Sequence, residues 1–482
     1  MRTYDLVVMG AGSGNMLFGP DLDTMRAAVI EPDRFGGTCL NRGCIPSKML
    51  VVAADAACAV TDGHRLGVHA TLDRIDWPGI RDRVFGRIDP LHDSAADFRR
   101  SSGIDVYLDP ARFVAPRVLQ VGEQRITAER IVVAVGSRPI VPAIPGLETV
   151  PFYTSDTIMR IEEIPASLVV IGDGYIAAEL GHVFDAFGSD VTIVQRGPRL
   201  LTGEDEQVSA RFTELASRRH RVLVDTSVVS IEARGSGVGV TVERSGQFEV
   251  LQATAVLVAT GRAPNTDLID VAAGQLDIDD HGHLVTDDTH RTSVPGVWAL
   301  GDAANHFQLK HMANAEMRVV RHNLTHGHTP RHQSHDLVPH AVFSDPQIAS
   351  VGLTQRQARQ RGVSHVVAVR AYADVAYGWA LEDTTSFVKL LADPQQRTLL
   401  GAHIIGPQAA TLLQPLVQAM MLGQSVDQLA HDVLYIHPAI SEVLEGALLE
   451  LAEHPPGTDP GSQPHGTGLA EEFNVPTPAT DP

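Results

Sequence analysis

Two short apolar runs, each ending in a glycine-rich loop, constrain the fold of this chain more than any other feature. Tyr4 to Met9 leads into Gly10, and Leu168 to Ile171 leads into Gly172, about 160 residues later. An apolar strand followed by a glycine-rich turn is typical of a βαβ unit that binds a nucleotide at the start of its helix. Two such units predict an α/β protein with two nucleotide-binding domains.

The length and texture of the chain predict further domains. With 482 residues, the chain is too long for a single hydrophobic core. A loop rich in Pro and Gly closes the first unit near residue 150. After residue 335, short strands, an apolar helix pattern and an Asp-Pro turn predict an α+β domain. The last 30 residues or so are rich in Pro, Gly, Thr and Asp, and we expect a disordered tail there.

Charge and composition argue against several kinds of partner and site. Thirty-eight Lys and Arg against 58 Asp and Glu give a net charge of -20, which predicts no binding to nucleic acid or to anionic membranes. The N-terminus passes directly into the first strand, and we identify no apolar run of helix length, so we expect a cytoplasmic protein. Three cysteines are too few for a secreted disulfide framework or a cysteine-based zinc site, so no metal is expected.

The first glycine loop contains Gly10, Gly12 and Gly14. Glycines at these positions allow a tight turn and let backbone N–H groups approach a pyrophosphate. Glu31 follows at the distance where an acid at the end of the second strand accepts hydrogen bonds from a ribose. Asn15 replaces the usual third glycine, and Pro20 predicts that the helix after this loop is short.

The second loop, with Gly172, Gly174 and Tyr175, is followed by a clear amphipathic helix pattern. Gln195 ends the next strand where an NAD site would place its ribose acid. Arg196 and Arg199 follow it and suit the 2′-phosphate of NADPH. The alternative is that both arginines are solvated surface residues.

The segment GGTCLNRGCIPSK contains Cys39 and Cys44. Pro46 is suited to the first turn of a helix, which would place both thiols around a helix N-terminus. That end of a helix stabilises a thiolate, the nucleophile in thiol–disulfide exchange. The alternative is a pair of buried small hydrophobic residues. Cys58 lies on the apolar face of the predicted helix and is expected to be inert.

Near the C-terminus, His437 is followed five positions later by Glu442. A carboxylate can hold an imidazole in one tautomer, so that the histidine relays protons to thiols. Among 22 histidines, such a pair means little without the cysteine motif.

Six motifs in this order resemble the glutathione reductase and dihydrolipoamide dehydrogenase family of flavoprotein disulfide reductases: GAGSG, GGTCLNRGCIPSK, GDGYIAAE, ATGRAPN, ALGD and HPAISE. Further segments, RVFGRIDP, TSDTIMRIEEIP, FSDPQIASVGLT and DVAYGWALEDT, are similar to the mycothione reductase branch. The resemblance spans roughly residues 4 to 451 and rests on several independent motifs.

The resemblance implies FAD and NADPH as cofactors. It implies two Rossmann-like domains, for FAD at 1–150 and 276–335 and for NADPH at 151–275, a dimerisation domain at 336–452 and a tail at 453–482. The implied cofactor contacts are Gly10, Gly12, Gly14, Glu31, Gly37, Thr38, Lys48, Gly136, Gly172, Gly174, Tyr175, Arg196, Arg199, Gly261 and Asp302.

The resemblance also implies roles for the catalytic residues. Electrons pass from NADPH through flavin to the Cys39–Cys44 disulfide, with Cys44 beside the flavin and Cys39 as the thiol that attacks the substrate. His437 of the partner subunit in a homodimer, steadied by Glu442, is the expected proton donor. Lys48 is expected to pair with Glu179, which spacing alone cannot predict.

Two departures bear on the substrate. Val135 replaces a threonine usual in the family, and the stretch between Gly14 and Arg26 has no basic residue where glutathione reductases contact glutathione. The absence favours mycothione, whose sugars carry no such carboxylates, over glutathione disulfide. The alternatives are a dihydrolipoamide dehydrogenase, a glutathione-type reductase and, in another class, a non-catalytic flavin-binding redox sensor.

Overall fold

The computed structural model describes residues 1–454 and divides into two compact units. The first comprises Met1–Ala57, Asp73–Arg196 and Thr226–His335. The second comprises Cys58–Leu72, Gly197–Asp225 and the chain from Asp336 onward. The predicted tail, 453–482, lies outside the described residues except for Glu453, which ends the last helix, and His454. The finer domain boundaries stay a prediction.

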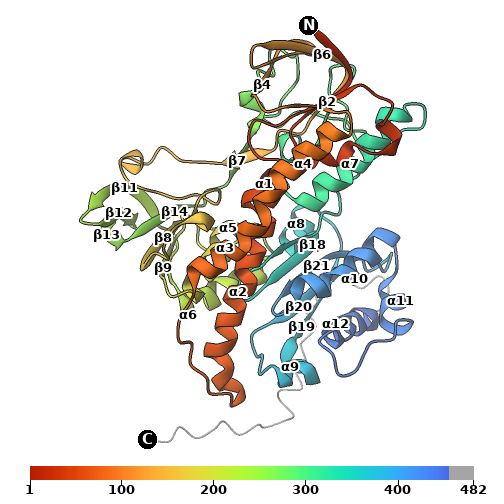
Figure 1. Ribbon diagram of the computed structural model, residues 1–482. Helices are drawn as coiled ribbons and strands as arrows, with labels where there is room; N and C mark the ends of the chain where they lie inside the picture. Colours follow the sequence, from red (N-terminus) through yellow and green to blue (C-terminus); the bar gives the residue numbers. More distant parts are fainter. Residues whose placement is uncertain (455–482) are drawn as a thin grey trace, which may run out of the picture. The chain divides into compact units, whose positions relative to one another are not determined.

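The first glycine loop directly follows β1, a strand of a seven-stranded sheet (Figure 1). Its order is β3-β2-β1-β6-β5-β4, with β16 also paired to β6. Strands β1, β2, β3, β6 and β16 run in parallel register, whereas β4 and β5 are antiparallel. The strands are β1 Arg2–Met9, β2 Ala27–Ile30, β3 Asp105–Tyr107, β4 Ala111–Ala115, β5 Val118–Val121, β6 Gln124–Val133 and β16 Val297–Ala299.

Strand β1 is buried on both faces, which explains its unbroken apolar run. Val7 and Met9 belong to one hydrophobic core, and Leu6 and Val8 belong to another. The helices of this part are α1 Gly37–Arg42, α2 Cys44–Asp62, α3 Trp77–Ile88, α4 Pro90–Ser101 and α7 Lys310–Thr325. The stretch after the glycine loop forms only two 3₁₀ turns, Gly14–Leu17 and Pro20–Leu22, as its proline predicted.

The second glycine loop joins another parallel sheet, in which β8 pairs with both β9 and β14. These strands are β8 Ser167–Ile171, β9 Asp190–Val194 and β14 Ala255–Val258, and helix α5 is Tyr175–Ala186. An antiparallel sheet follows, with β11 Ser227–Arg234, β12 Gly237–Arg244 and β13 Gln247–Ala253. A two-stranded ladder pairs β7 Ser137–Pro139 with β15 Arg262–Pro264.

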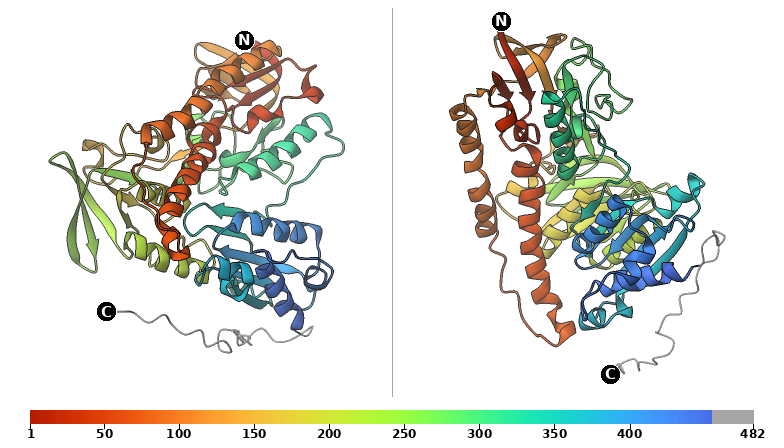
Figure 2. Two further views of the ribbon diagram at one scale, coloured as in Figure 1. Left: turned by 60° about the horizontal axis from the view of Figure 1, so that its bottom comes forward. Right: turned by 90° about the vertical axis from the view of Figure 1, so that its right-hand side faces the viewer.

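The second unit is built on a five-stranded antiparallel sheet in the order β17-β18-β21-β20-β19. Helix α10 packs on β18 and β21, and α12 packs on β19 and β20 (Figure 2). The cis Asp345–Pro346 bond lies in the turn between β17 and β18, where the Asp-Pro turn was predicted.

The strands of this sheet are β17 His340–Val342, β18 Ile348–Gly352, β19 Val366–Ala371, β20 Phe387–Ala392 and β21 Leu399–Ile405. The remaining elements of the unit are α6 Glu206–Arg219, β10 Arg221–Leu223, α8 Gln355–Gln360, α9 Ala376–Ala380, α10 Ala409–Leu422, α11 Val426–His431 and α12 Glu442–Glu453. The α+β texture expected after residue 335 is therefore correct.

The expectation that the chain has no apolar run of helix length is wrong. The helical stretch Gly37–Leu66 is long and apolar enough to cross a membrane by length and composition. Core helices of soluble proteins pass the same test, and 39% of its apolar window is buried inside the structure. The stretch also contains Cys39, Cys44 and Lys48, whose contacts are described below.

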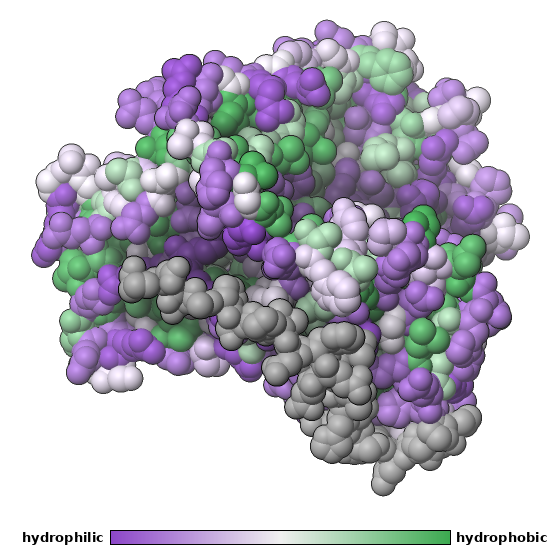
Figure 3. Space-filling model, turned by 90° about the horizontal axis from the view of Figure 1, so that it is seen from below, coloured by the Kyte–Doolittle hydropathy of each residue, from purple (hydrophilic) through white to green (hydrophobic). Residues whose placement is uncertain are grey.

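On the face shown in Figure 3, hydrophilic side chains predominate and hydrophobic ones are scattered between them.

Candidate active site

Cys39 and Cys44 lie where two helices follow each other. Cys39 is in α1, Gly43 separates the helices, and α2 begins at Cys44, two residues before Pro46. Both are free thiols in this structure. A hydrogen bond from Cys39, followed by the charge of Lys48, lowers the pKa of Cys44 to about 7. The same contact and burial raise the pKa of Cys39. Cys44 is therefore the thiol held ready as a thiolate.

The Lys48 ammonium lies one helical turn after Cys44 and contacts helix α5. Its Nζ atom lies 2.5 Å from the Glu179 carboxylate, which is almost fully buried. The two residues are 131 positions apart, so sequence spacing could not have predicted this contact. A buried carboxylate needs a cationic partner, and here it fixes the charge that acts on Cys44.

Lys310 is a further cation whose charge acts on both cysteines, and it was not predicted from the sequence. It begins helix α7, and its Nζ donates a 2.8 Å hydrogen bond to Ser13 in the first glycine loop. Its charge counteracts the rise in the pKa of Cys39, while burial lowers its own pKa. The contact with Ser13 joins segments 297 residues apart, so no local sequence pattern could predict it.

The first glycine loop approaches other backbone so closely that side chains are excluded. A Cβ on Gly10 would lie 2.2 Å from the carbonyl oxygen of Ala134, and one on Gly37 would lie 2.7 Å from Cα of Gly12. Gly10 also has a φ of 104°, which favours glycine. A Cβ on Gly14 would instead meet the side chains of Ala134 and Val8, each at 2.9 Å. Two loops that meet through bare backbone fit the pyrophosphate of a dinucleotide.

Acidic groups follow two strands of the seven-stranded sheet, β2 and β16. Glu31 follows β2, and its Oε2 accepts a 2.8 Å hydrogen bond from the backbone of Ala11, while burial raises its pKa. Asp302 follows β16 and accepts a 2.6 Å hydrogen bond from Ser137, next to Gly136. With Thr38 in the first turn of α1, this donor and acceptor set fits an FAD.

The second glycine loop repeats the geometry of the first. Gly172 has a φ of 132°, and a Cβ there would lie 2.2 Å from the carbonyl oxygen of Ala259. Gly174 is the N-cap of α5, and Tyr175 is the first residue of that helix and is 40% exposed. Gly261 has a φ of 111° in the loop after β14. This arrangement fits a second dinucleotide at the N-terminus of α5.

The residues expected to choose between nicotinamide nucleotides follow strand β9. The side chain of Gln195 accepts a 2.7 Å hydrogen bond from the backbone N–H of Arg196, whose own side chain is exposed. The Arg199 side chain is half-buried and donates to the carbonyl of Glu206. Of the two arginines, Arg196 is the one whose side chain points to solvent in this structure.

His437 and Glu442 form the predicted pair in the second unit. The imidazole Nδ1 lies 2.7 Å from the Glu442 carboxylate, and this hydrogen bond lowers the pKa of Glu442. The carboxylate also accepts from the backbone of Ala439. The His437 side chain is 71% exposed, so its other nitrogen is open to a second molecule.

Cys58 is buried, as predicted for an inert thiol. Its sulfur accepts a hydrogen bond from Arg219, and burial raises its pKa.

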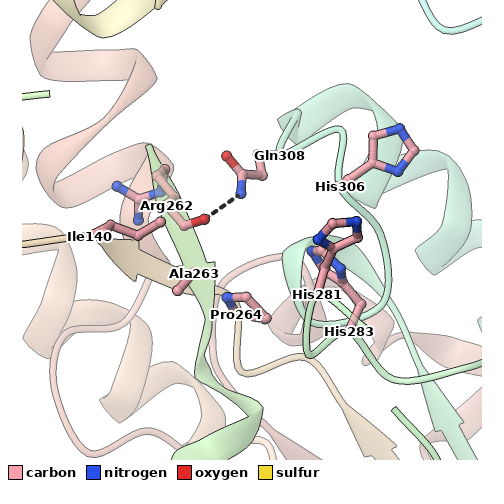
Figure 4. A pocket seen from close by; sticks show the side chains of 8 residues that line it. All are labelled: Ile140, Arg262, Ala263, Pro264, His281, His283, His306 and Gln308. Carbon is pink, nitrogen blue, oxygen red and sulfur yellow. Dashed lines mark hydrogen bonds between the residues drawn. The ribbon is translucent and has the colours of Figure 1, made fainter. Parts of the chain in front are cut away.

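A pocket of about 540 Å³ lies beside the β7–β15 ladder (Figure 4). Its lining residues are Ile140, Arg262, Ala263, Pro264, His281, His283, His306 and Gln308. The Gln308 amide donates to the carbonyl of Arg262 across the pocket. Three imidazoles on one side give the pocket a polar wall that sequence analysis did not foresee.

Comparisons with known proteins agree with this geometry. The family model for pyridine nucleotide-disulphide oxidoreductases matches residues 4–318, and the dimerisation-domain model of that family matches residues 338–448. Mycothione reductase from Mycobacterium tuberculosis is 44% identical over 463 residues, 94% of this chain and 100% of that protein. The chain belongs to the flavoprotein disulfide reductase family.

More distant members of the family are also similar over nearly the whole chain. Dihydrolipoyl dehydrogenase from Bacillus subtilis is 30% identical over 448 residues, covering 91% of this chain and 94% of that protein. The HOCl-induced flavoprotein disulfide reductase RclA from Escherichia coli has a TM-score of 0.81 at 27% identity, over 92% of this chain and 99% of that chain.

Family membership confirms the predicted α/β fold, with two nucleotide-binding domains and a dimerisation domain. It also confirms the expectation of an FAD-dependent disulfide oxidoreductase. The expected cofactors, FAD and NADPH, agree with it. The roles of individual residues stay predictions, which the geometry above makes specific.

In the reduced enzyme, alkylation of Cys44 is expected to follow a midpoint near pH 7. Its pKa is lowered from the ordinary thiol value, so the reactive thiolate is present above pH 7 and is lost as the pH falls through about 7. Mass spectrometry after brief iodoacetamide pulses measures this. Lys48→Met should move the midpoint upward, and Cys58, whose pKa is raised, serves as the internal control. An unchanged midpoint in Lys48→Met would remove the role given to that charge.

Proposed function

We propose that this enzyme is an NADPH-dependent reductase of mycothione. The observation that carries the proposal is the Cys39–Cys44 thiol pair at the start of α2, with Lys48 and Glu179 beside it and a pKa of about 7 at Cys44. The similarity to mycothione reductase along almost the whole chain supports the substrate class.

The proposed chemistry begins with the glycine loops. Gly10, Gly12 and Gly37 would hold the FAD pyrophosphate, with Glu31 at the ribose and Asp302 near Gly136. When bound, FAD would pass two electrons from NADPH to the Cys39–Cys44 disulfide, which opens into a thiol at Cys39 and a thiolate at Cys44.

Thiol–disulfide exchange then proceeds on the side chains of the protein. The sulfur of Cys39 attacks one sulfur of the substrate, forming a mixed disulfide and releasing the first thiol as a thiolate. His437 of the partner subunit gives that thiolate a proton, and Glu442 holds the imidazole in the donating tautomer. The thiolate of Cys44 attacks the sulfur of Cys39, re-forms the Cys39–Cys44 disulfide and expels the second product as a thiolate, which takes a proton from solvent.

Homodimer formation follows from the same proposal. The dimerisation-domain match covers residues 338–448, which include both His437 and Glu442. An exposed imidazole on such a domain suits a site completed by a second chain. We further propose that the enzyme works in the cytoplasm, where glutathione-type thiols are kept reduced.

A preference for NADPH over NADH is expected from Arg196. A charge-assisted contact to a phosphate is worth about 1.5–3 kcal/mol, so Arg196→Gln should lower kcat/KM for NADPH by at least about tenfold and leave NADH nearly unchanged. Steady-state kinetics with both nucleotides measures this. Arg125→Gln, an exposed arginine in β6, is the matched control. Equal kcat/KM for both nucleotides in the unmodified enzyme would mean that Arg196 is a solvated surface residue without a role in choosing the nucleotide.

Mycothione is expected to be reduced with higher kcat/KM than glutathione disulfide or lipoamide. Two guanidinium groups contact the segment after Gly14, and both are engaged: Arg99 with Asn15, and Arg321 with Asp21. Neither is therefore available to a glutathione carboxylate, whereas neutral sugars need only hydrogen bonds. A net charge of -20 also repels anionic disulfides.

Parallel assays of NADPH oxidation at fixed ionic strength test the substrate. Each disulfide is offered to the same preparation, with the Cys39→Ser enzyme as the blank. Higher kcat/KM with glutathione disulfide or lipoamide would contradict the assignment to mycothione and leave the family assignment intact.

A further inference from the structure

Three side chains without a role in the proposed reaction meet next to the Gly301–Ala303 turn. His290 precedes β16, Glu316 lies in α7, and His335 ends the first unit. One ring nitrogen of each histidine and one carboxylate oxygen all lie within 4.8 Å of one another. The imidazole Nε2 of His335 is 2.9 Å from Oε1 of Glu316, and the two imidazole centroids are 6.0 Å apart.

Two members of this cluster are removed from solvent. His290 and Glu316 are each only 1% exposed. Nε2 of His290 is buried and has no hydrogen-bond partner among the described residues. A buried polar nitrogen without a partner is unfavourable, so this imidazole lacks a group that the rest of the cluster could help to hold.

The Glu316 carboxylate is fixed by further hydrogen bonds. Its Oε2 accepts from the backbone of Gly301 at 2.6 Å, and its Oε1 accepts from the Asn305 amide at 2.8 Å. Ligating carboxylates are typically oriented by such outer contacts. A plain His335–Glu316 ion pair would explain part of the geometry, but it leaves Nε2 of His290 unsatisfied.

We propose that His290, Glu316 and His335 bind a divalent transition-metal cation of the Zn²⁺ class. Two imidazoles and one carboxylate suit Zn²⁺, Co²⁺, Ni²⁺ or Cu²⁺, whereas Mg²⁺ and Ca²⁺ prefer sets made of oxygen alone. The cation replaces the His335–Glu316 hydrogen bond, and water completes its coordination. No metal was expected from the sequence because the chain lacks a second cysteine pair, whereas these ligands come from three separate segments of the first unit.

The geometry needs only a small adjustment to bind the ion. Ligand atoms about 2.0–2.1 Å from Zn²⁺ stand about 3.3 Å apart in a tetrahedron, so separations of up to 4.8 Å must shorten. His335 can move, because its side chain is 35% exposed and gives the ion a way in. Phe307 packs on His335 at 5.4 Å between centroids and on His306 at 4.3 Å, which connects the cluster to the polar wall of the pocket in Figure 4.

Zinc binding to untagged, flavin-loaded protein tests the site. Thiolates are good zinc ligands, so the measurement uses the Cys39→Ser/Cys44→Ser double variant, which removes the active-site thiols. The test variant is His335→Gln, whose amide can still donate to Glu316 but replaces an imidazole ligand. The matched control is His332→Gln, since His332 is an exposed histidine paired with Asp288. Calorimetry, zinc content after dialysis and thermal unfolding with and without Zn²⁺ are measured in parallel.

The expected result is about one tightly held Zn²⁺ per chain in the parent and in His332→Gln, with affinity at least about tenfold weaker in His335→Gln. Zinc should raise Tm in the first two proteins only. Anomalous diffraction from zinc-soaked crystals should place a peak among His290, Glu316 and His335. Equal binding by the parent and His335→Gln, no tight binding at all, or a peak only elsewhere would overturn the proposal.

Discussion

Cys39→Ser is expected to abolish disulfide reduction, lowering kcat/KM by more than about 10³-fold, because a serine hydroxyl cannot form the mixed disulfide. Flavin content and reduction of the flavin by NADPH should be retained, since Cys39 is not among the residues proposed to hold the cofactors. Stopped-flow absorbance separates the half-reaction with NADPH from turnover with mycothione.

Cys58→Ser is the matched control for this substitution. Cys58 is buried in the second unit and accepts a hydrogen bond from Arg219. Turnover of Cys58→Ser should therefore stay within about twofold of the unmodified enzyme as long as the protein folds. Retained turnover in Cys39→Ser would contradict the role given to Cys39. No turnover in the unmodified protein with any disulfide would favour the remaining alternative, a flavin-binding protein whose cysteines sense redox state without catalysing reduction.

His437→Ala is expected to lower kcat by about 10²–10⁴-fold with little change in flavin reduction, because the thiolate then leaves without its general acid. The loss should be smaller at low pH, where solvent supplies protons more readily. Steady-state kinetics across pH measures the effect, and exposed His64→Ala is the control.

Co-expression tells whether His437 acts across a subunit boundary. A dimer of one Cys39→Ser chain and one His437→Ala chain retains one intact site if the histidine comes from the partner, so about half of the normal activity should return. Purification through two different tags isolates the mixed dimer. Mixed dimers that form and stay inactive would place His437 with the cysteines of its own chain.

Local sequence patterns were enough to predict the parts of the fold that depend on backbone constraints. Gly10 and Gly172 are recognisable because both need a positive φ and a backbone approach that excludes a side chain. Pro20 predicted that the helix after the first glycine loop is shortened, and the Asp345–Pro346 pair predicted the turn between β17 and β18. These features act over a few residues, so they are visible in any short window.

Contacts between distant segments could not be predicted in this way. Lys48 in α2 reaches Glu179 in α5, and Lys310 in α7 reaches Ser13, only because folding brings together segments that lie far apart in the chain. The Lys48–Glu179 contact was expected solely through the family resemblance, and Lys310 was missed altogether. The His290, Glu316 and His335 cluster was missed for the same reason, since folding alone brings its members together.

The absorbance spectrum of the two-electron-reduced enzyme tests the central claim, that Cys44 is the thiolate beside the flavin and Cys39 the thiol that meets substrate. Anaerobic titration with NADPH is followed in the unmodified enzyme, Cys39→Ser and Cys44→Ser. Above pH 7, a long-wavelength charge-transfer band should appear in the unmodified enzyme after two-electron reduction. In Cys39→Ser it should be present before NADPH is added, because Cys44 then has no disulfide partner, and it should be missing from Cys44→Ser throughout. A band that persists in Cys44→Ser and disappears in Cys39→Ser would reverse the two roles and contradict the account.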